Sequence, residues 1–481
     1  MSKVKRILAV VLAMAMVMAM SVVSFAADSV PKDGDQLEVT IANVDNASLK
    51  VVQIIEAKYS TYGLEYYQWT TASGKEGQVK FKNDEVEGLT SEYITNLART
   101  AEGNAFINGG YLKPGTYMVI ATSNDPSVVY NPMVVSVYYT KDGLQAAPLT
   151  DTNWELETTD AYAKKSSQSF DKEVTGAAHG TENLTDSKDV QVGDKVSFKI
   201  TGTIPSYSAQ FTKPVYKISD TLTKGLEKYE NIVVKVGGVP LTESETTYSL
   251  TDITDESKTF TVEFVSSYIS GLADKTEEAR SVEITYDATV TAEATSTVPA
   301  TNEATITYSH TPDEEKTDTK TTKTYTFELD NNFTKVDENK TALPNAEFTL
   351  YRHYTNGTLT EEVAKKTSDK NGNIVFTGLD ATTYYLKETA APNGYQLNDT
   401  VYTVEIKAEY DENGVPTKTV SITDPSNTDS AASDHVEIQN THLSALPSTG
   451  GAGIIVFTIV GCIIMIAAAS MFFLSGRKKE E

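Results

Sequence analysis

The sequence predicts an all-β chain of three tandem β-sandwich domains, flanked by an N-terminal signal peptide and a C-terminal transmembrane helix. Apolar and polar residues alternate over short runs at 196–200, 325–329 and 402–406, which is typical of half-buried strands. Turn-forming pairs such as Asn356-Gly357 and Asn371-Gly372 separate the runs. Many short strands with regular turns favour immunoglobulin-like sandwiches.

The N-terminus has the three-part layout of a secretory signal peptide. Basic residues at positions 3–6 precede an apolar run over 7–23, and small residues follow at 24–27. This order predicts a signal peptide over residues 1–26, cleaved after Ala26. The chain is therefore expected outside the membrane.

The C-terminus carries a short motif, an apolar stretch and a basic tail in that order. The apolar stretch at 454–474 is long enough to cross a membrane, and the basic residues at 477–479 should remain in the cytoplasm. The preceding motif is Leu446, Pro447, Ser448, Thr449 and Gly450.

This three-part pattern over residues 446–481 resembles the LPXTG cell-wall sorting signal of sortase substrates. Pro447 fixes its own φ and biases the preceding residue towards an extended shape, which suits an enzyme groove. The resemblance implies that a sortase cysteine attacks the Thr449 carbonyl and releases Gly450 with everything after it. The Thr449 acyl group would then pass to an amine.

Composition excludes some classes of protein. The chain has 481 residues and a formal net charge of −25, which argues against nucleic-acid binding and suits a solvated surface protein. Its one cysteine, Cys462, lies in the apolar stretch, so the exported part has no disulfide. Because disulfides commonly stabilise secreted domains, we expect another stabilising device.

Two polar stretches predict the domain boundaries. Residues 164–169 are expected to form a linker, and residues 311–322 either a second linker or a long hairpin. Short helices are expected near 90–101 and at 270–279. The expected domains are an N-domain at 27–163, a middle domain at 164–323 and a C-domain at 324–443.

The segments 333–337, 346–350, 384–395 and 436–440 closely resemble a collagen-adhesin B-type repeat domain. In that family a lysine on the first strand and an asparagine on the last form an amide, assisted by a glutamate. The resemblance assigns these roles to Lys335, Asn440 and Glu388.

This chemistry is reasonable from first principles. Burial among Phe333, Phe348 and Phe376 would lower the pKa of the Lys335 ammonium and raise that of Glu388. A neutral amine beside a protonated acid can attack the asparagine carbonyl, while the acid shuttles protons until ammonia leaves.

The middle-domain segments 170–174, 216–222 and 301–305 are similar to those of shaft pilins, and the matching residues are Lys172, Asp220 and Asn302. The competing interpretation for both domains is that these are ordinary surface lysines and turn asparagines. In the N-domain, Ile120 occupies the position that matches Glu388, so no such bond is expected there unless another residue supplies the acid.

A polymer also needs an acceptor amine on each subunit. Shaft pilins carry it in a motif near the end of the N-domain, where a tryptophan precedes a Val-Tyr-Pro-Lys-like segment. Trp154 and Tyr162 fit this pattern, although alanines replace the valine and the proline. The resemblance makes Lys164 the acceptor, with Lys165 as the alternate.

The expected function is a wall-attached structural shaft subunit of a surface pilus, joined from Thr449 of one copy to Lys164 of the next. The expected partners are other copies, pilus-specific and housekeeping sortases, peptidoglycan, tip and basal pilins, and a host ligand. The alternative is a monomeric wall-anchored adhesin. An enzyme ranks last because HExxH, GxSxG and a cysteine nucleophile are missing. No cofactor is expected, and no metal at 369–380, where Ile374 replaces the glycine of a calcium loop.

Overall fold

The structure is a computed structural model that describes residues 29–82, 85–141, 144–145, 147–180, 187–251, 253–254, 256–425, 432–443 and 452–476. The signal peptide and the motif from Leu446 to Gly450 lie outside the described residues. The chain forms two compact units, each described by itself. The first contains the chain up to Phe327 with two short later segments, Gly378–Asp380 and Tyr410–Pro416, and the second contains the remainder.

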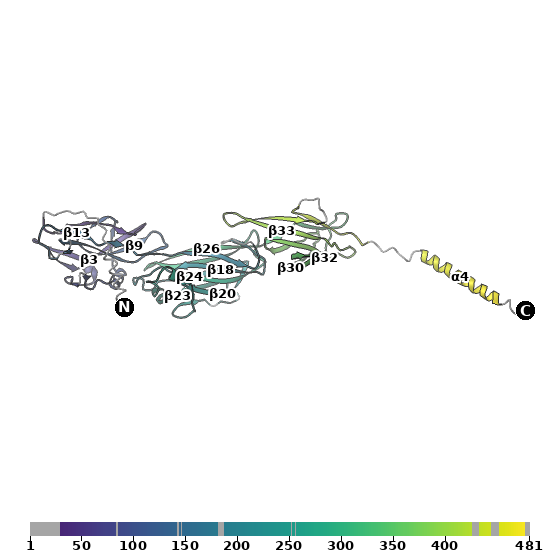
Figure 1. The fold of residues 1–481 in the computed structure, drawn as a ribbon, viewed down its shortest axis with the longest axis horizontal. Coiled ribbons are helices and arrows are strands. Elements are labelled where there is room, and N and C mark those ends of the chain that lie inside the picture. The colour runs from purple at the N-terminus through teal and green to yellow at the C-terminus, as the bar shows by residue number, and fades with distance from the viewer. Residues whose placement is uncertain are drawn as a thin grey trace. The chain divides into compact units, whose positions relative to one another are not determined.

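The first half of unit 1 is built around one antiparallel sheet whose strands differ in length (Figure 1). Its elements are β1 (Leu37–Val39), β2 (Ile41–Ala42), β3 (Ala47–Ser60), β4 (Gly63–Trp69), η1 (Thr71–Ser73), β5 (Phe81–Lys82), β6 (Glu85–Val86), α2 (Ser91–Ala98), β7 (Asn104–Phe106), β8 (Gly110–Leu112), β9 (Gly115–Ser123), β10 (Val128–Tyr130), β11 (Met133–Lys141), β12 (Leu144–Gln145), β13 (Glu155–Thr158), β14 (Ala161–Tyr162) and β15 (Lys165–Ser167).

The central strands of this sheet run in the order β12-β11-β9-β3-β4, and they are covered on both faces. Val51 and Val119 belong to one buried apolar cluster, whereas their neighbours Val52 and Met118 belong to another. Because both faces are buried, β9 reads as a nearly continuous apolar run rather than as an alternation.

The helix expected near 90–101 is present as α2. Its first turn is capped by Thr90, whose side-chain oxygen accepts a hydrogen bond from the backbone N–H of Tyr93 at 3.1 Å. Ile94 is the buried residue of this helix, and its side chain faces the core. The linker expected at 164–169 is partly a strand, because β15 pairs with β10.

The second half of unit 1 contains two larger sheets. Its elements are β16 (Phe170–Ala177), β17 (Ser187–Asp189), β18 (Lys195–Thr203), β19 (Tyr216–Leu222), β20 (Leu226–Val236), β21 (Val239–Pro240), β22 (Tyr248–Leu250), β23 (Thr259–Phe264), α3 (Ser266–Ser270), η2 (Glu278–Arg280), β24 (Ser281–Val290), β25 (Ala300–Thr311), β26 (Glu314–Tyr325) and β27 (Phe327–Leu329).

One sheet has the order β16-β18-β24-β20-β21, and the other β17-β26-β25-β19-β23-β22. Inward residues of both, such as Phe198 on β18, Ile284 on β24 and Ile306 on β25, belong to one apolar cluster. This arrangement is the expected β-sandwich, with a core between two sheets.

Two expectations for this region are corrected. Residues 311–322 are not a linker but belong to the long hairpin β25–β26, which was the alternative interpretation. The helix expected at 270–279 is displaced, since α3 ends at Ser270 with Gly271 as its C-cap and η2 begins only at Glu278. Asn302 therefore lies on the penultimate long strand of this sandwich and not on its last.

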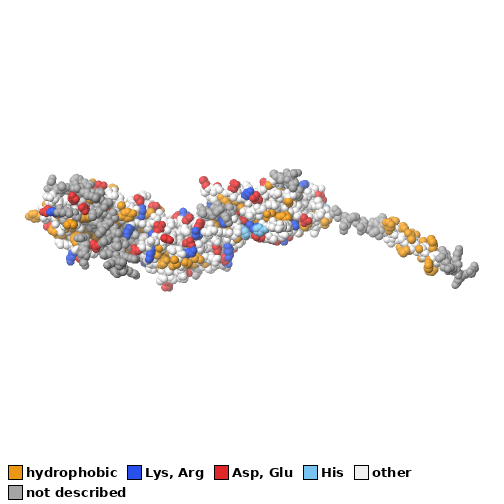
Figure 2. Space-filling view, viewed as in Figure 1, with side chains coloured by type: hydrophobic (Ala, Val, Ile, Leu, Met, Phe, Trp, Pro, Cys, Tyr) orange, Lys and Arg blue, Asp and Glu red, His pale blue; other side chains and the backbone are white. Residues whose placement is uncertain are grey.

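Unit 2 holds a five-stranded antiparallel sheet in the order β30-β29-β32-β33-β34 and a parallel pair, β28 with β35. Helix α4 contains an apolar stretch, Ile455–Phe473, that is long enough to cross a membrane, and Figure 2 shows hydrophobic side chains along it. The elements are β28 (Phe333–Val336), β29 (Glu347–Thr355), β30 (Thr358–Thr367), β31 (Phe376–Leu379), β32 (Thr383–Ala390), β33 (Val401–Tyr410), β34 (Pro416–Thr423), β35 (Val436–Gln439) and α4 (Ala452–Gly476).

Candidate functional site

The middle region brings Lys172, Asp220 and Asn302 together between its two sheets. Lys172 lies on β16 of one sheet, while Asp220 on β19 and Asn302 on β25 belong to the other. In the ladder Asn302 pairs with Leu222 and Asp220 pairs with Ala304, so the two polar residues are diagonal neighbours on the same face. All three side chains are buried.

A tyrosine hydroxyl links these three side chains. The Tyr286 hydroxyl donates a hydrogen bond to Asp220 Oδ2 at 2.7 Å. It accepts hydrogen bonds from Lys172 Nζ at 2.7 Å and from Asn302 Nδ2 at 2.9 Å. Lys172 also contacts Asp220 directly, and the Tyr229 hydroxyl donates to Asp220 Oδ1 at 3.1 Å. The Tyr286 hydroxyl therefore contacts the amine, the acid and the amide of the predicted cross-link.

Burial sets the protonation of this cluster. It lowers the pKa of Lys172 and raises the pKa of Asp220, and both shifts outweigh the attraction between the opposite charges. Burial therefore favours a neutral amine and a protonated carboxylic acid. The carbonyl oxygen Oδ1 of Asn302 is buried without a hydrogen-bond partner. An acid that reorients towards this oxygen would satisfy it and polarise the amide.

The sequence reasoning missed Tyr286 and Tyr229. Tyr286 lies on the same face of β24 as Ile284 and Ala288, and this period-two pattern indicates only an inward-facing side chain. A buried tyrosine normally finds a partner for its hydroxyl, which is the one signal that a sequence offers. The identity of that partner depends on how the two sheets face each other.

The unit 2 cluster contains Lys335, Glu388 and Asn440, all of them buried. Lys335 on β28 pairs with Ile438 on β35, and Asn440 follows two residues later on the same side. Glu388 Oε1 accepts a hydrogen bond from Asn440 Nδ2 at 2.8 Å, and its Oε2 accepts one from the backbone N–H of Asn398 at 2.9 Å. Lys335 Nζ donates to the Ile438 carbonyl at 2.9 Å.

The electrostatics of this second cluster follow the same direction as those of the first. Burial lowers the pKa of Lys335 to about 8, against the opposing attraction of Glu388. Burial also raises the pKa of Glu388, although hydrogen bonds from Asn398 and Asn440 oppose the shift. Phe333, which precedes Lys335 on β28, is fully buried. As with Asn302, the Asn440 carbonyl oxygen has no hydrogen-bond partner.

The described residues before position 164 include no buried lysine. The N-terminal core instead contains a tyrosine network, in which the Tyr139 hydroxyl donates to Asp35 Oδ2 at 2.9 Å and contacts the Tyr59 hydroxyl at 3.0 Å. Ile120 lies half-buried on β9. The described part of this region therefore brings together no lysine cluster of the kind found in the other two.

The predicted acceptor segment is held in place by backbone pairing. Strand β14 pairs in parallel with β2, and the N–H of Ala163 donates to the Ala42 carbonyl at 3.0 Å. Ala161 and Ala163 are buried, whereas Tyr162 and Lys164 are exposed. The two alanines that departed from the family motif are thus the inward positions of an extended segment.

The two candidate lysines differ in their surroundings. Lys165 Nζ forms an ion pair with Asp45, and this hydrogen bond raises the pKa of Lys165. The side chain of Lys164 is exposed, and within the described ranges it has no ion pair or hydrogen bond. Its backbone carbonyl is fixed by the N–H of Asn131 at 3.0 Å. Lys164 therefore combines a fixed backbone with an accessible amine.

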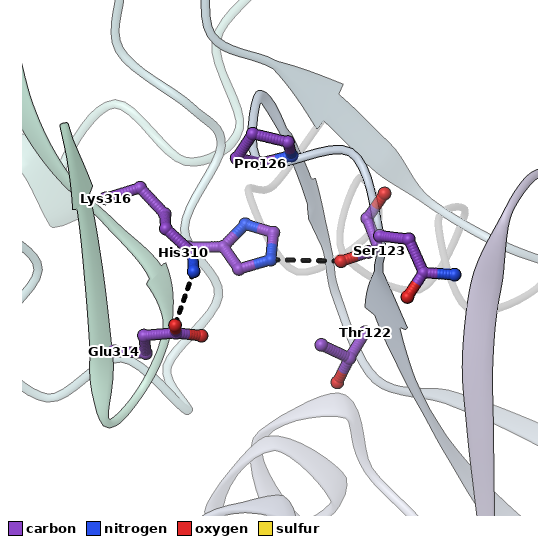
Figure 3. Close-up of a pocket in the computed structure, with 7 residues that line it drawn as sticks. Thr122, Ser123, Pro126, His310, Glu314 and Lys316 are labelled. Atoms are coloured by element: carbon purple, nitrogen blue, oxygen red, sulfur yellow. Dashed lines mark hydrogen bonds and ion pairs between the residues drawn. The ribbon is translucent and has the colours of Figure 1, made fainter. Parts of the chain in front are cut away.

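A surface depression of unit 1 contains none of the predicted site residues. It is bordered by the Thr122–Pro126 turn region and by the β25–β26 hairpin (Figure 3). The His310 Nε2 donates a hydrogen bond to the Ser123 carbonyl at 3.2 Å, and Glu314 pairs with Lys316. The His310–Ser123 bond joins two parts of unit 1 that are far apart in sequence, and neither contact involves a lysine cluster.

The chain is similar to two family models and to a curated relative of known fold. Residues 330–424 match the SpaA family, described as a prealbumin-like fold domain, and residues 439–481 match the LPXTG cell wall anchor motif. The trypsin-resistant surface T6 protein of Streptococcus pyogenes is 25% identical, over 92% of this chain and 95% of the relative. The structure of the T6 backbone pilin of serotype M6 S. pyogenes covers 86% of this chain and all of its own, with 21% identity and a TM-score of 0.60.

The anchor motif and the β-rich, multidomain fold define a cell-wall-anchored surface protein of a Gram-positive type. The chain also contains a prealbumin-like domain, is similar in sequence to the T6 surface protein over most of its length, and shares the fold of the T6 backbone pilin. By its printed name, the T6 relative of known structure is the backbone subunit of a pilus.

Proposed function

We propose that this protein is the shaft subunit of a covalent surface pilus, polymerised by a sortase. The sortase thiol would attack the Thr449 carbonyl, expel Gly450 and the membrane helix, and retain the subunit as a thioester. The Lys164 amine of another copy would then attack the thioester, release the thiol and form an amide. The supporting observation is that Lys164 is an exposed amine on a backbone fixed by β14 and Asn131.

Within each subunit, two further amides would form without an enzyme. In each, the neutral lysine amine attacks the asparagine side-chain carbonyl, and the amide nitrogen leaves as ammonia. Asp220 would assist the Lys172–Asn302 bond, and Glu388 the Lys335–Asn440 bond. The opposite pKa shifts of lysine and acid in both clusters support this mechanism.

These bonds suit a protein that carries tension. The Lys172–Asn302 bond would join the two sheets of one sandwich, and the Lys335–Asn440 bond would join the first and last strands of unit 2. A pulling force would then load covalent bonds instead of hydrogen-bond ladders. Because no disulfide is available in the exported chain, such bonds would provide its covalent reinforcement.

The test is a blot of muramidase-released wall extract, run after boiling in SDS. The wild-type strain is compared with the Lys164→Ala and Lys165→Ala variants. The proposal expects a ladder in wild type and in Lys165→Ala, and a single monomer band in Lys164→Ala. Ladders that persist in Lys164→Ala and collapse in Lys165→Ala would move the acceptor by one residue. A single band in every strain would instead identify a monomeric wall-anchored adhesin.

A further inference from the structure

Two exposed tyrosines lie on one face of unit 1 beside the acceptor lysine. Along the segment that runs from β1 into β2, the side chains of Glu38, Thr40 and Ala42 are exposed, and the residues between them are buried. Tyr111 is the ladder partner of Glu38, and Tyr162 is the partner of Ala42. Since side chains alternate along a strand, these five residues face the same side. We call Glu38, Thr40, Ala42, Tyr111 and Tyr162 the tyrosine face.

Lys164 continues this face. It follows Tyr162 by two residues, and the buried Ala163 separates them, so the alternation places both outward. Tyr111 is 61% exposed and Tyr162 is 63% exposed. The offset of four residues from Glu38 to Ala42 separates the two tyrosines by about 13 Å along the strands. One exposed aromatic residue is ordinary, but two in a row that leads to a reactive amine form a surface suited to contact.

The length of the C-terminal tether limits what lies near this face in a polymer. Leu443 is fixed to the folded unit, because its N–H donates to the Gly394 carbonyl at 2.9 Å. Thr449 is six residues further along (449 − 443 = 6). An extended chain spans at most about 3.3–3.6 Å per residue, so Thr449 reaches only about 20 Å from Leu443. In a Thr449–Lys164 conjugate, the end of unit 2 is therefore held close to Lys164 of the other copy.

The surface at that end of unit 2 is partly aromatic and apolar. The rings of Tyr395 and His442 are in contact, with centroids 4.2 Å apart, and Leu443 is largely exposed. The Glu338 carboxylate contacts Nδ1 of the His442 ring. Tyr395, His442 and Leu443 thus form a compact exit surface from which the tether leaves.

We propose that the tyrosine face is the docking surface for the exit surface of a second copy of this chain. This inference depends on the proposed polymer, because the short tether supplies the proximity. The tyrosine rings would pack against Leu443 and the Tyr395–His442 pair, which buries apolar area and favours aromatic contacts. Docking would also present Thr449 to Lys164 in a narrow range of positions.

The test compares tyrosine nitration by tetranitromethane in two wall extracts. One is the wild-type polymer and the other is the Lys164→Ala monomer, and peptide mass spectrometry quantifies each site. We expect nitration of Tyr111 and Tyr162 to be several-fold lower in the polymer. Tyr62 is the internal control, because it is 76% exposed and follows the far end of the 14-residue strand β3. Its nitration should be equal in both samples.

Equal nitration of Tyr111 and Tyr162 in polymer and monomer would overturn the docking surface while leaving the proposed polymer intact. A Tyr111→Ser/Tyr162→Ser double variant adds a second readout, and shorter ladders with unchanged wall anchoring are expected. Shorter ladders together with equal nitration would assign the face to the sortase and overturn the second-copy assignment. A ladder that persists in Lys164→Ala would remove the premise and refute both proposals.

Discussion

Lys335 lies on β28, Asn440 directly follows the parallel strand β35 two residues beyond the partner of Lys335, and both side chains are buried. In the other cluster, the lysine and the asparagine come from opposite sheets of a sandwich. Two different strand arrangements therefore produce one chemical grouping of amine, acid and amide. In both, the amide carbonyl oxygen lacks a partner and the acid has a raised pKa.

The first prediction concerns mass. The folded wild-type ectodomain should fall short of its sequence mass by two ammonias. Asn440→Ala and Glu388→Gln should each fall short by one, because the middle cluster still reacts and acts as an internal control. Intact-mass spectrometry of the purified protein is the measurement. A wild-type mass equal to the sequence mass would show that neither amide forms.

The second prediction concerns stability. The Lys335–Asn440 bond would close a loop of 105 residues (440 − 335). For a cross-linked loop of about 100 residues, the loss of unfolded-state entropy corresponds to about 4.7 kcal/mol. Glu388→Gln, which keeps the shape of the side chain, should lower the free energy of unfolding of unit 2 by about that amount. Urea unfolding followed by a probe in unit 2 tests this, and a change under about 1 kcal/mol would contradict it.

The third prediction assigns a positioning role to Tyr286. Tyr286→Phe removes the hydroxyl that contacts Lys172, Asp220 and Asn302 but keeps the ring. Bond formation in the middle region should become slow and incomplete, so the purified protein should be a mixture of reacted and unreacted masses. Tyr216→Phe is the matched control, because Tyr216 is also fully buried but its hydroxyl has no hydrogen-bond partner. Complete reaction in Tyr286→Phe would show that the hydroxyl is dispensable.

The fourth prediction is a bell-shaped dependence of bond formation on pH. The reactive state needs a neutral Lys335 and a protonated Glu388, and burial brings their pKa values towards each other. Below the raised pKa of Glu388, the reactive fraction falls as the amine is protonated. Above the Lys335 pKa of about 8, it falls because the acid is ionised while the amine is already neutral. The measurement needs unreacted protein, which has been kept unfolded in urea since its synthesis. Refolding it at several pH values, with timed mass measurements, tests this prediction, and a rate that rises continuously above pH 8 would contradict it.

The sequence predicted the fold better than it predicted the environment of the sites. Period-two alternation correctly located β18 and β33, because each has one buried and one solvated face. It failed for β26, whose Thr- and Lys-rich sequence resembles a linker although the strand pairs along most of its length with β25. The sequence also did not predict the hydrogen bonds of the Tyr286 hydroxyl, because its partners come from distant strands that only the folded sandwich brings together.

The segment that leads to the proposed acceptor Lys164 is tied to the first of the described residues, Ser29. Trp154 is buried, and its Nε1 donates a hydrogen bond to the Ser29 carbonyl at 2.8 Å. Its ring packs edge-on against Tyr139 at a centroid distance of 5.0 Å, and the Tyr139 hydroxyl donates to Asp35. The chain just after the expected signal-peptide cleavage site therefore supports the strand that precedes Lys164.

The fifth prediction follows from this contact. Trp154→Phe keeps an aromatic ring but removes the donor to Ser29, at a cost of about 1 kcal/mol for one hydrogen bond. Because the acceptor segment then loses a support, the ladder in wall extract should shorten and monomer should accumulate, while wall anchoring and the two-ammonia mass deficit remain. Trp69→Phe is the matched control, since Trp69 is equally buried and packs edge-on against Tyr93, away from Ser29. Equal shortening in both variants would indicate general destabilisation, and a normal ladder in Trp154→Phe would show that Lys164 is positioned without the N-terminus.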